Sequence, residues 1–172
     1  MPMSAKTLES RFALAKVLVV DDEPGMRKVV RALLMSIGVQ NIYEAAGASR
    51  GLEIVRSKAP HVVILDWEMP GLDGACFMRF LRSAGSAAHS DVPVIMLSGH
   101  SERSRVMEAM KLGVNEFLLK PVSSAALRER LIAVLVNPRP MVRQGDYYGP
   151  LPRKNPPAVQ EDPQHNPHLI LL

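Results

Sequence analysis

Hydrophobic positions along this chain form two kinds of segment between Lys16 and about Asn137. Short apolar runs are separated by longer stretches in which apolar residues recur at helical spacing. We expect the short runs, most of them rich in β-branched residues, to be strands: residues 17–20, 42–45, 62–65, 94–97 and 117–119. Four of them are wholly apolar, as in strands that helices cover on both faces. Run 42–45 is the least apolar, because it contains Tyr43 and Glu44, and it suits an edge strand.

The stretches between these runs predict five helices, and residues that favour helix ends stand at suitable places. Pro24 suits the first turn of the first helix, Gly38 suits its end, and Pro60 follows the second helix. The candidate N-caps are Asp73 for the third helix, Ser101 for the fourth, and Ser123 or Ser124 for the fifth. Strands that alternate with helices predict an α/β fold, a doubly wound parallel sheet with helices on both faces.

Three regions follow from this pattern. Residues 14–137 form the predicted domain, and residues 1–13 are an N-terminal extension. Residues 138–172 contain eight of the fourteen prolines and almost no periodicity. We therefore expect this tail to be extended or disordered.

Composition narrows the function classes. The formal charge of +4 comes from the two ends of the chain, and no run of Lys and Arg is interleaved with aromatic residues, so we expect no direct DNA binding. Cys76 is the only cysteine, which excludes an intrachain disulfide and a cysteine-based zinc site. Glu9 and Arg11 interrupt any signal-peptide core, and no apolar run is long enough to cross a membrane, so we expect a cytoplasmic protein.

Polar side chains follow four of the five predicted strands at the point where each ends. Asp21-Asp22-Glu23 follows the first run, Asp66 the third, Ser98 the fourth and Lys120 the fifth. Because ligands collect at the carboxyl ends of parallel strands, we expect these groups to meet at one sheet edge. Ordinary surface polarity would explain any one of them, but it explains the whole set less well.

This set of residues indicates phosphoryl chemistry. Clustered carboxylates repel one another unless a cation neutralises them, and Mg²⁺ prefers oxygen ligands. A carboxylate can then attack phosphorus, while the Lys120 ammonium and the Ser98 hydroxyl share the phosphoryl charge. A carboxylate nucleophile needs no separate base.

Four segments resemble the motifs of one known family, the receiver domains of two-component response regulators. They are residues 19–24 (acidic start), 65–74 (phosphoacceptor loop), 96–99 (switch hydroxyl) and 117–122 (lysine loop). The match covers Lys16 to about Asn137 with every element in order. The resemblance implies a flavodoxin-like (βα)5 fold.

The resemblance also implies roles for single residues. Asp66 would be the phosphoacceptor and a Mg²⁺ ligand, with Asp22 as a direct ligand, Asp21 acting partly through water, and the Glu68 backbone carbonyl completing the set. Ser98 and Phe117 would be a coupled switch pair, although Phe117 can equally be a plain core aromatic. The Lys120-Pro121 peptide bond is cis in such domains.

Two features depart from the common family pattern. Phe117 has no hydroxyl, where many relatives carry tyrosine. Glu68 and His100 occupy variable positions that influence how long the phosphoryl group survives, although both can also be ordinary solvent-facing side chains.

The predicted function is a stand-alone signalling switch. A histidine kinase or a histidine phosphotransfer protein would phosphorylate Asp66, and the signal would pass through contacts with a downstream protein or onward in a relay. Catalysis would be limited to its own phosphotransfer and autodephosphorylation. A phosphohydrolase is the second hypothesis, but Glu68 stands where such enzymes place a second aspartate. A degenerate receiver that binds constitutively is the third, and the intact acidic set argues against it.

Overall fold

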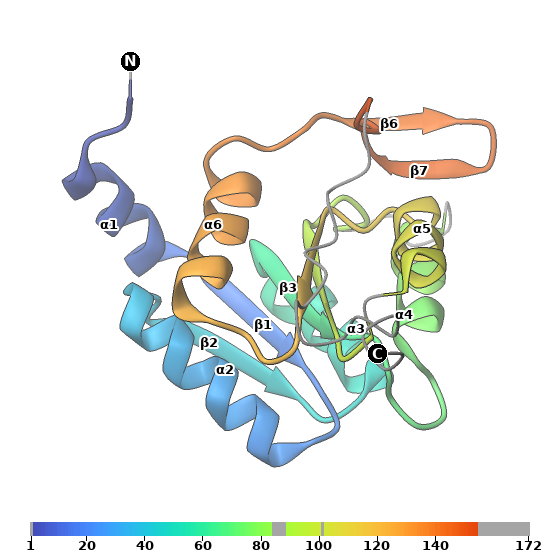
Figure 1. Cartoon of the computed structure of the whole chain (residues 1–172), viewed down its shortest axis with the longest axis horizontal. Helices are drawn as coiled ribbons and strands as arrows, with labels where there is room; N and C mark the ends of the chain where they lie inside the picture. Colours follow the sequence, from blue (N-terminus) through green and yellow to red (C-terminus); the bar gives the residue numbers. More distant parts are fainter. Residues whose placement is uncertain (1, 84–88, 101, 155–172) are drawn as a thin grey trace, which may run out of the picture.

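The computed structural model describes residues 2–83, 89–100 and 102–154. Its centre is a parallel sheet of five strands in the order β2-β1-β3-β4-β5 (Figure 1). The strands are β1 (Lys16–Val20), β2 (Asn41–Ala45), β3 (Val62–Asp66), β4 (Val94–Ser98) and β5 (Glu116–Leu119). The predicted doubly wound α/β fold is confirmed, and β2 is an edge strand as its polar residues indicated.

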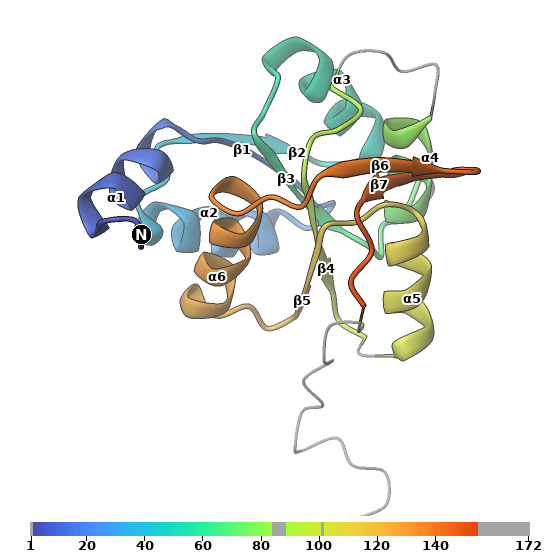
Figure 2. The same ribbon diagram turned by 90° about the horizontal axis from the view of Figure 1, so that it is seen from above.

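Helices cover both faces of this sheet (Figure 2). One apolar cluster joins the sheet to α3 (Ala48–Lys58), α4 (Gly74–Arg82) and α5 (Arg103–Lys111). A second joins the opposite face to α2 (Pro24–Ile37) and α6 (Ser124–Leu135). Leu18 belongs to the first cluster and Val19 to the second, because successive side chains of a strand point to opposite faces. This burial on both sides explains the continuous apolar runs.

The predicted helix ends agree well with the structure. Gly38 ends α2 with a φ of 109°, a left-handed conformation that glycine adopts without steric cost. Asp73 caps α4 by accepting a hydrogen bond from the Cys76 amide, and Ser123 caps α6 through the Ala126 amide. The proposed cap Ser101 lies outside the described residues.

A helix that the sequence pattern did not indicate precedes the first strand. This helix, α1 (Ala5–Leu14), begins at the Ser4 cap, whose hydroxyl accepts a hydrogen bond from the Thr7 amide. Its Phe12 is only 1 % exposed and packs in the cluster with α2 and α6. The N-terminal extension therefore contributes to the core.

The expectation that residues 138–172 lack regular structure is wrong for part of that segment. β6 (Met141–Gln144) and β7 (Tyr147–Pro150) form an antiparallel hairpin. Its two-residue loop includes Gly145 at a φ of 60°, as tight hairpin turns require. The described prolines of this segment stand before β6, at the end of β7 or after it, so they leave the ladder intact. The tail beyond residue 154 lies outside the described residues.

Among the described residues, we find no helix that is both long and apolar enough to cross a membrane.

Candidate functional site

The candidate site lies at the carboxyl edge of the central sheet. Asp21 and Asp22 follow β1, Asp66 ends β3, Ser98 ends β4, and Lys120 follows β5. The parallel pairing of the four strands aligns these ends. The structure thus brings together residues that stand up to about a hundred positions apart in the chain.

Three carboxylates form a compact acidic cluster. Each of Asp21, Asp22 and Asp66 offers an oxygen within 4.8 Å of the other two. Asp21 is 1 % exposed and Asp66 is 2 % exposed, so little solvent screens their charges. Asp21 Oδ1 accepts a hydrogen bond from the Glu23 amide at 2.8 Å, whereas its buried Oδ2 has no hydrogen-bond donor in the described structure.

Burial makes the charges of this acidic cluster unfavourable. It raises the pKa of Asp66 from 3.8 to about 6, although the hydrogen bond from Lys120 opposes the shift. Burial also raises the pKa of Asp21, and the nearby Asp22 adds to that effect. The site is therefore poised to gain from an added positive charge.

Lys120 is the basic group that faces the acidic cluster. Its Nζ donates to Asp66 Oδ1 at 3.0 Å and lies 3.7 Å from Asp21 Oδ2. Burial lowers the pKa of Lys120, but the hydrogen bond and the charge of Asp66 outweigh that effect and leave the pKa raised. The Lys120-Pro121 peptide bond is cis, as the resemblance implied.

The donor set fits a magnesium ion. Mg²⁺ binds through one or two carboxylates and keeps several other oxygen ligands, which suits a buried cluster of three aspartates. The Asp21 oxygen without a hydrogen-bond donor is the clearest sign that this edge accommodates a cation. The role of the Glu68 carbonyl stays a prediction.

Glu68 makes contacts that sequence reasoning missed. Its carboxylate accepts hydrogen bonds from the Ser98 hydroxyl at 2.6 Å and the Gly99 amide at 3.3 Å. It also lies 3.0 Å from His100 Nδ1 and 3.2 Å from Arg105 Nη1. Burial raises the pKa of Glu68, but these hydrogen bonds outweigh it and lower the pKa below its ordinary value. No periodicity links positions so far apart, so only the fold reveals this network.

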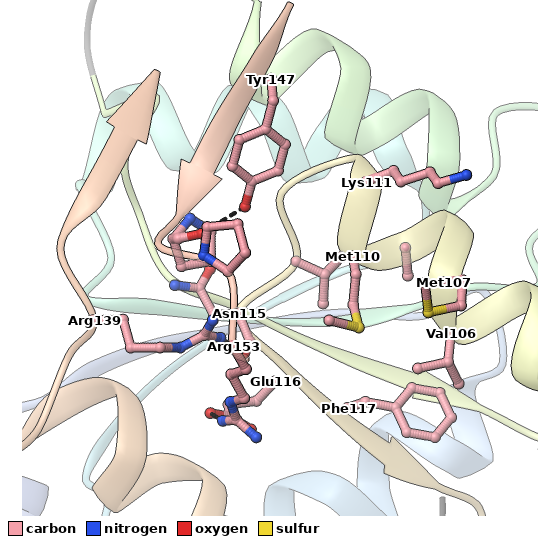
Figure 3. A pocket seen from close by; sticks show the side chains of 14 residues that line it. Val106, Met107, Met110, Lys111, Asn115, Glu116, Phe117, Arg139, Tyr147 and Arg153 are labelled. Carbon is pink, nitrogen blue, oxygen red and sulfur yellow. Dashed lines mark hydrogen bonds and ion pairs between the residues drawn. The ribbon is translucent and has the colours of Figure 1, made fainter. Parts of the chain in front are cut away.

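Phe117 lies on β5, on the same face of the sheet as Ser98. Its ring is half-buried against the cluster of α3, α4 and α5, which fits the reading of a plain core aromatic. The ring also lines a cavity of about 300 Å³ (Figure 3), where an aromatic side chain has room to move. The switch role of Phe117 stays a prediction.

Comparison with known proteins identifies the same region of the chain. The family model of the response regulator receiver domain matches residues 17–132. Chemotaxis protein CheY-3 of Vibrio cholerae is 34 % identical over 116 residues, which are 67 % of this chain and 88 % of that protein. Chemotaxis protein CheY of Pseudomonas aeruginosa is 32 % identical and is covered to 92 %, again over 67 % of this chain.

Solved structures agree with this match. The chemotaxis protein CheY4 of Vibrio cholerae superposes with a TM-score of 0.65 at 28 % identity, over 72 % of this chain and all of that one. CheY in a CheX-CheY-BeF3-Mg²⁺ complex from Borrelia burgdorferi gives 0.63 at 26 % identity, over 71 % of this chain and 90 % of that one. The β6–β7 hairpin lies outside the residues that the family model matches.

Proposed function

This chain belongs to the family of response regulator receiver domains, and on that basis we propose that Asp66 accepts a phosphoryl group from a partner protein. The donor is a histidine kinase or a histidine phosphotransfer protein, and the reaction takes place in the cytoplasm. The modified domain then signals by changing its affinity for another protein.

One observation carries this proposal: Asp66 is a buried carboxylate that meets both an ammonium and two further carboxylates. Lys120 donates to Asp66 at 3.0 Å, and oxygens of Asp21 and Asp22 lie within 4.8 Å. An aspartate with only a structural role at the end of a central strand would be stabilised by the lysine, but it would be destabilised by the two neighbouring carboxylates. The combination serves a reaction better than it serves stability.

The proposed step needs no base from the protein. A carboxylate oxygen of Asp66 attacks phosphorus, an O–P bond forms, and the P–N bond to the donor histidine breaks. The imidazole leaves with the electron pair and takes a proton from solvent. Lys120 donates to the phosphoryl oxygens and offsets part of their charge. When bound by Asp21, Asp22, Asp66 and the Glu68 carbonyl, Mg²⁺ supplies further positive charge.

Ser98 links the site to the rest of the domain. Its buried hydroxyl donates to Glu68 in the unphosphorylated protein. To donate to a phosphoryl group on Asp66 instead, it must leave Glu68. We infer that this exchange moves the β4–α5 connection and, with it, Phe117. Water attack on the acyl phosphate returns the domain to its starting state, so catalysis is limited to its own phosphorylation and dephosphorylation.

Phosphorylation by a small acyl phosphate tests the proposal. With Mg²⁺ present, the intact mass should rise by one phosphoryl group, and alkaline pH should remove it. Asp66→Asn should stay folded and unlabelled. Asp73→Asn is the matched control, because asparagine also caps helices and this carboxylate hydrogen-bonds only within α4 in the described structure. Labelling of the Asp66 variant, or its loss from the control alone, would contradict the assignment.

A further inference from the structure

The segment of residues 139–153, here named the C-terminal strap, is tied to the strand that leads into the proposed site. It contains the β6–β7 hairpin and follows the region that the family model matches. Arg139 Nη2 donates to the Asn115 carbonyl at 2.5 Å, and Arg153 forms an ion pair with Glu116. Arg139 Nη1 also donates to the Leu151 carbonyl at 2.7 Å, so one guanidinium holds both ends of the strap.

The ion pair with Arg153 compensates the charge of a buried carboxylate. Glu116 is 6 % exposed, and a buried carboxylate is costly unless cations compensate it. Its other cationic partner is Arg130 of α6, whose Nε is 3.9 Å away. Release of the strap would leave Glu116 with this more distant partner among the described residues.

A second contact is independent of charge. Gly149 of β7 packs directly on Gly113, at the turn between α5 and β5. A Cβ atom at Gly149 would lie 2.6 Å from Gly113 Cα, and one at Gly113 would lie 2.5 Å from the Tyr148 carbonyl oxygen. Such close backbone approach leaves no room for a layer of water, so the strap is seated on the domain.

The strap forms one wall of the cavity that Phe117 lines (Figure 3). Tyr147, Pro150 and Arg153 stand on the strap side, whereas Val106 and Met110 of α5 stand opposite. Below this cavity, β5 begins at Glu116, which holds the strap, and continues through Phe117; Lys120, which holds Asp66, follows directly after it. Strap and phosphorylation site are thus joined by a few consecutive residues.

From these contacts we propose that the docked C-terminal strap opposes phosphorylation of Asp66 and is loosened when phosphorylation occurs. The inference rests on the proposed function, in which Phe117 moves with Ser98. The strap lines the same cavity as the Phe117 ring and holds Glu116, the residue before it, so it favours the unphosphorylated arrangement of this strand. Because coupling between two sites is reciprocal, whatever the strap opposes must in turn weaken the strap.

The competing explanation is that the strap only protects an open sheet edge. Arg139 of the strap donates to the carbonyl of Asn115, next to β5, which would otherwise invite pairing with another chain. Arg130 of α6 does the same for the carbonyl of Phe117. Edge protection alone predicts no effect of the strap on the affinity of the site for a phosphoryl group.

Beryllofluoride with Mg²⁺, a mimic of the phosphoryl group, distinguishes these explanations in the full-length protein. Trp67, the only tryptophan, follows Asp66 and provides a fluorescence signal for its binding. Arg153→Ala removes the ion pair, and Gly149→Ala forces the hairpin off Gly113. Each should bind beryllofluoride about fivefold or more tightly than the wild type. Arg143→Ala, which removes the same charge from a side chain stacked on Tyr148, should not change the affinity.

Hydrogen exchange of the strap amides completes the test. Exchange should be faster in both loosened variants, and beryllofluoride should accelerate it in the wild type. Two results would overturn the inference and leave the proposed function intact. One is a strap that exchanges faster in a variant whose beryllofluoride affinity is unchanged. The other is a strap whose exchange neither substitution accelerates. A wild-type protein that fails to bind beryllofluoride would overturn the proposed function and this inference together.

Discussion

At the scale of single residues, the buried carboxylates of the site lower the stability of the domain. Asp21 and Asp66 are almost fully buried, yet Lys120 is the only ammonium within ion-pair distance of either in the described structure. Asp21 Oδ2 lacks a hydrogen bond, which a protein interior rarely tolerates without a reason. The metal-free domain should therefore gain stability when one of these charges is removed.

Asp66→Asn tests that expectation through pH. Burial raises the pKa of Asp66 in the folded protein from 3.8 to about 6, so the folded state binds this proton more tightly than the unfolded chain does. The resulting stabilisation is complete below about pH 4 and is lost as the pH rises through about 6. At pH 7.5, with EDTA present, Asp66→Asn should increase the free energy of unfolding by about 1–3 kcal/mol.

Urea unfolding of both proteins at pH 7.5 and pH 4 measures this difference. The advantage of the variant should shrink or disappear at pH 4, where the wild-type carboxyl is protonated. A variant that is less stable than the wild type at pH 7.5 would show that the Lys120 hydrogen bond outweighs the cost of burial.

Asp22→Asn tests the metal site more directly. Removal of one charge from the three-aspartate cluster should weaken Mg²⁺ binding about tenfold or more, because the cluster would bind the ion through its carboxylates. Titration followed by Trp67 fluorescence measures the affinity, with Asp73→Asn as the control. Equal affinities in wild type and Asp22→Asn would rule out Asp22 as a ligand.

Sequence reasoning found the chemical groups but not their side-chain contacts. Four groups are recognisable because each stands at the end of a strand or directly after it, where parallel topology determines its neighbours: Asp21, Asp66, Ser98 and Lys120. The contact of Glu68 with Ser98 depends on which way the segment after β3 turns, and no spacing rule encodes that.

At the scale of elements, the periodic core was predictable and the terminal segments were not. Strands buried on both faces give unmistakable apolar runs, and helix caps such as Asp73 and Ser123 mark their own positions. By contrast, α1 buries chiefly Phe12 and its other residues are mostly exposed, so it leaves little pattern. The hairpin is short, and the prolines around it resemble those of a disordered tail.

Phe12→Ala shows how far α1 contributes to the domain. Phe12 is among the largest fully buried side chains and packs in the cluster of α2 and α6. Its truncation should lower the free energy of unfolding by about 3–5 kcal/mol, as is typical for a core phenylalanine. Leu14→Ala, at a position that is 75 % exposed on the same helix, should cost far less. Similar, small effects of both substitutions in thermal or urea unfolding would mean that α1 is not part of the cooperative core.

At the scale of the whole molecule, one sheet edge organises everything that the proposal needs. The carboxyl ends of β1, β3, β4 and β5 collect the acids, the hydroxyl and the ammonium, and the two apolar clusters hold these ends in register. β5 has a second structural role: it connects Lys120, which follows its carboxyl end, to Glu116, which binds the C-terminal strap. In the proposed coupling, a structural change caused by phosphorylation of Asp66 has to pass along only this one strand to affect the strap.

Chemical trapping of the phosphorylated residue tests the central claim most directly. Borohydride reduces an acyl phosphate to the alcohol, which converts a phosphorylated aspartate into homoserine. After treatment with a small acyl phosphate and Mg²⁺, tandem mass spectrometry of two peptides tests the three aspartates. The peptide around β3 should contain homoserine at position 66, and the peptide around β1 should contain unmodified aspartate at positions 21 and 22. Homoserine at another position, or at none while the intact protein carries a phosphoryl group, would contradict Asp66 as the acceptor.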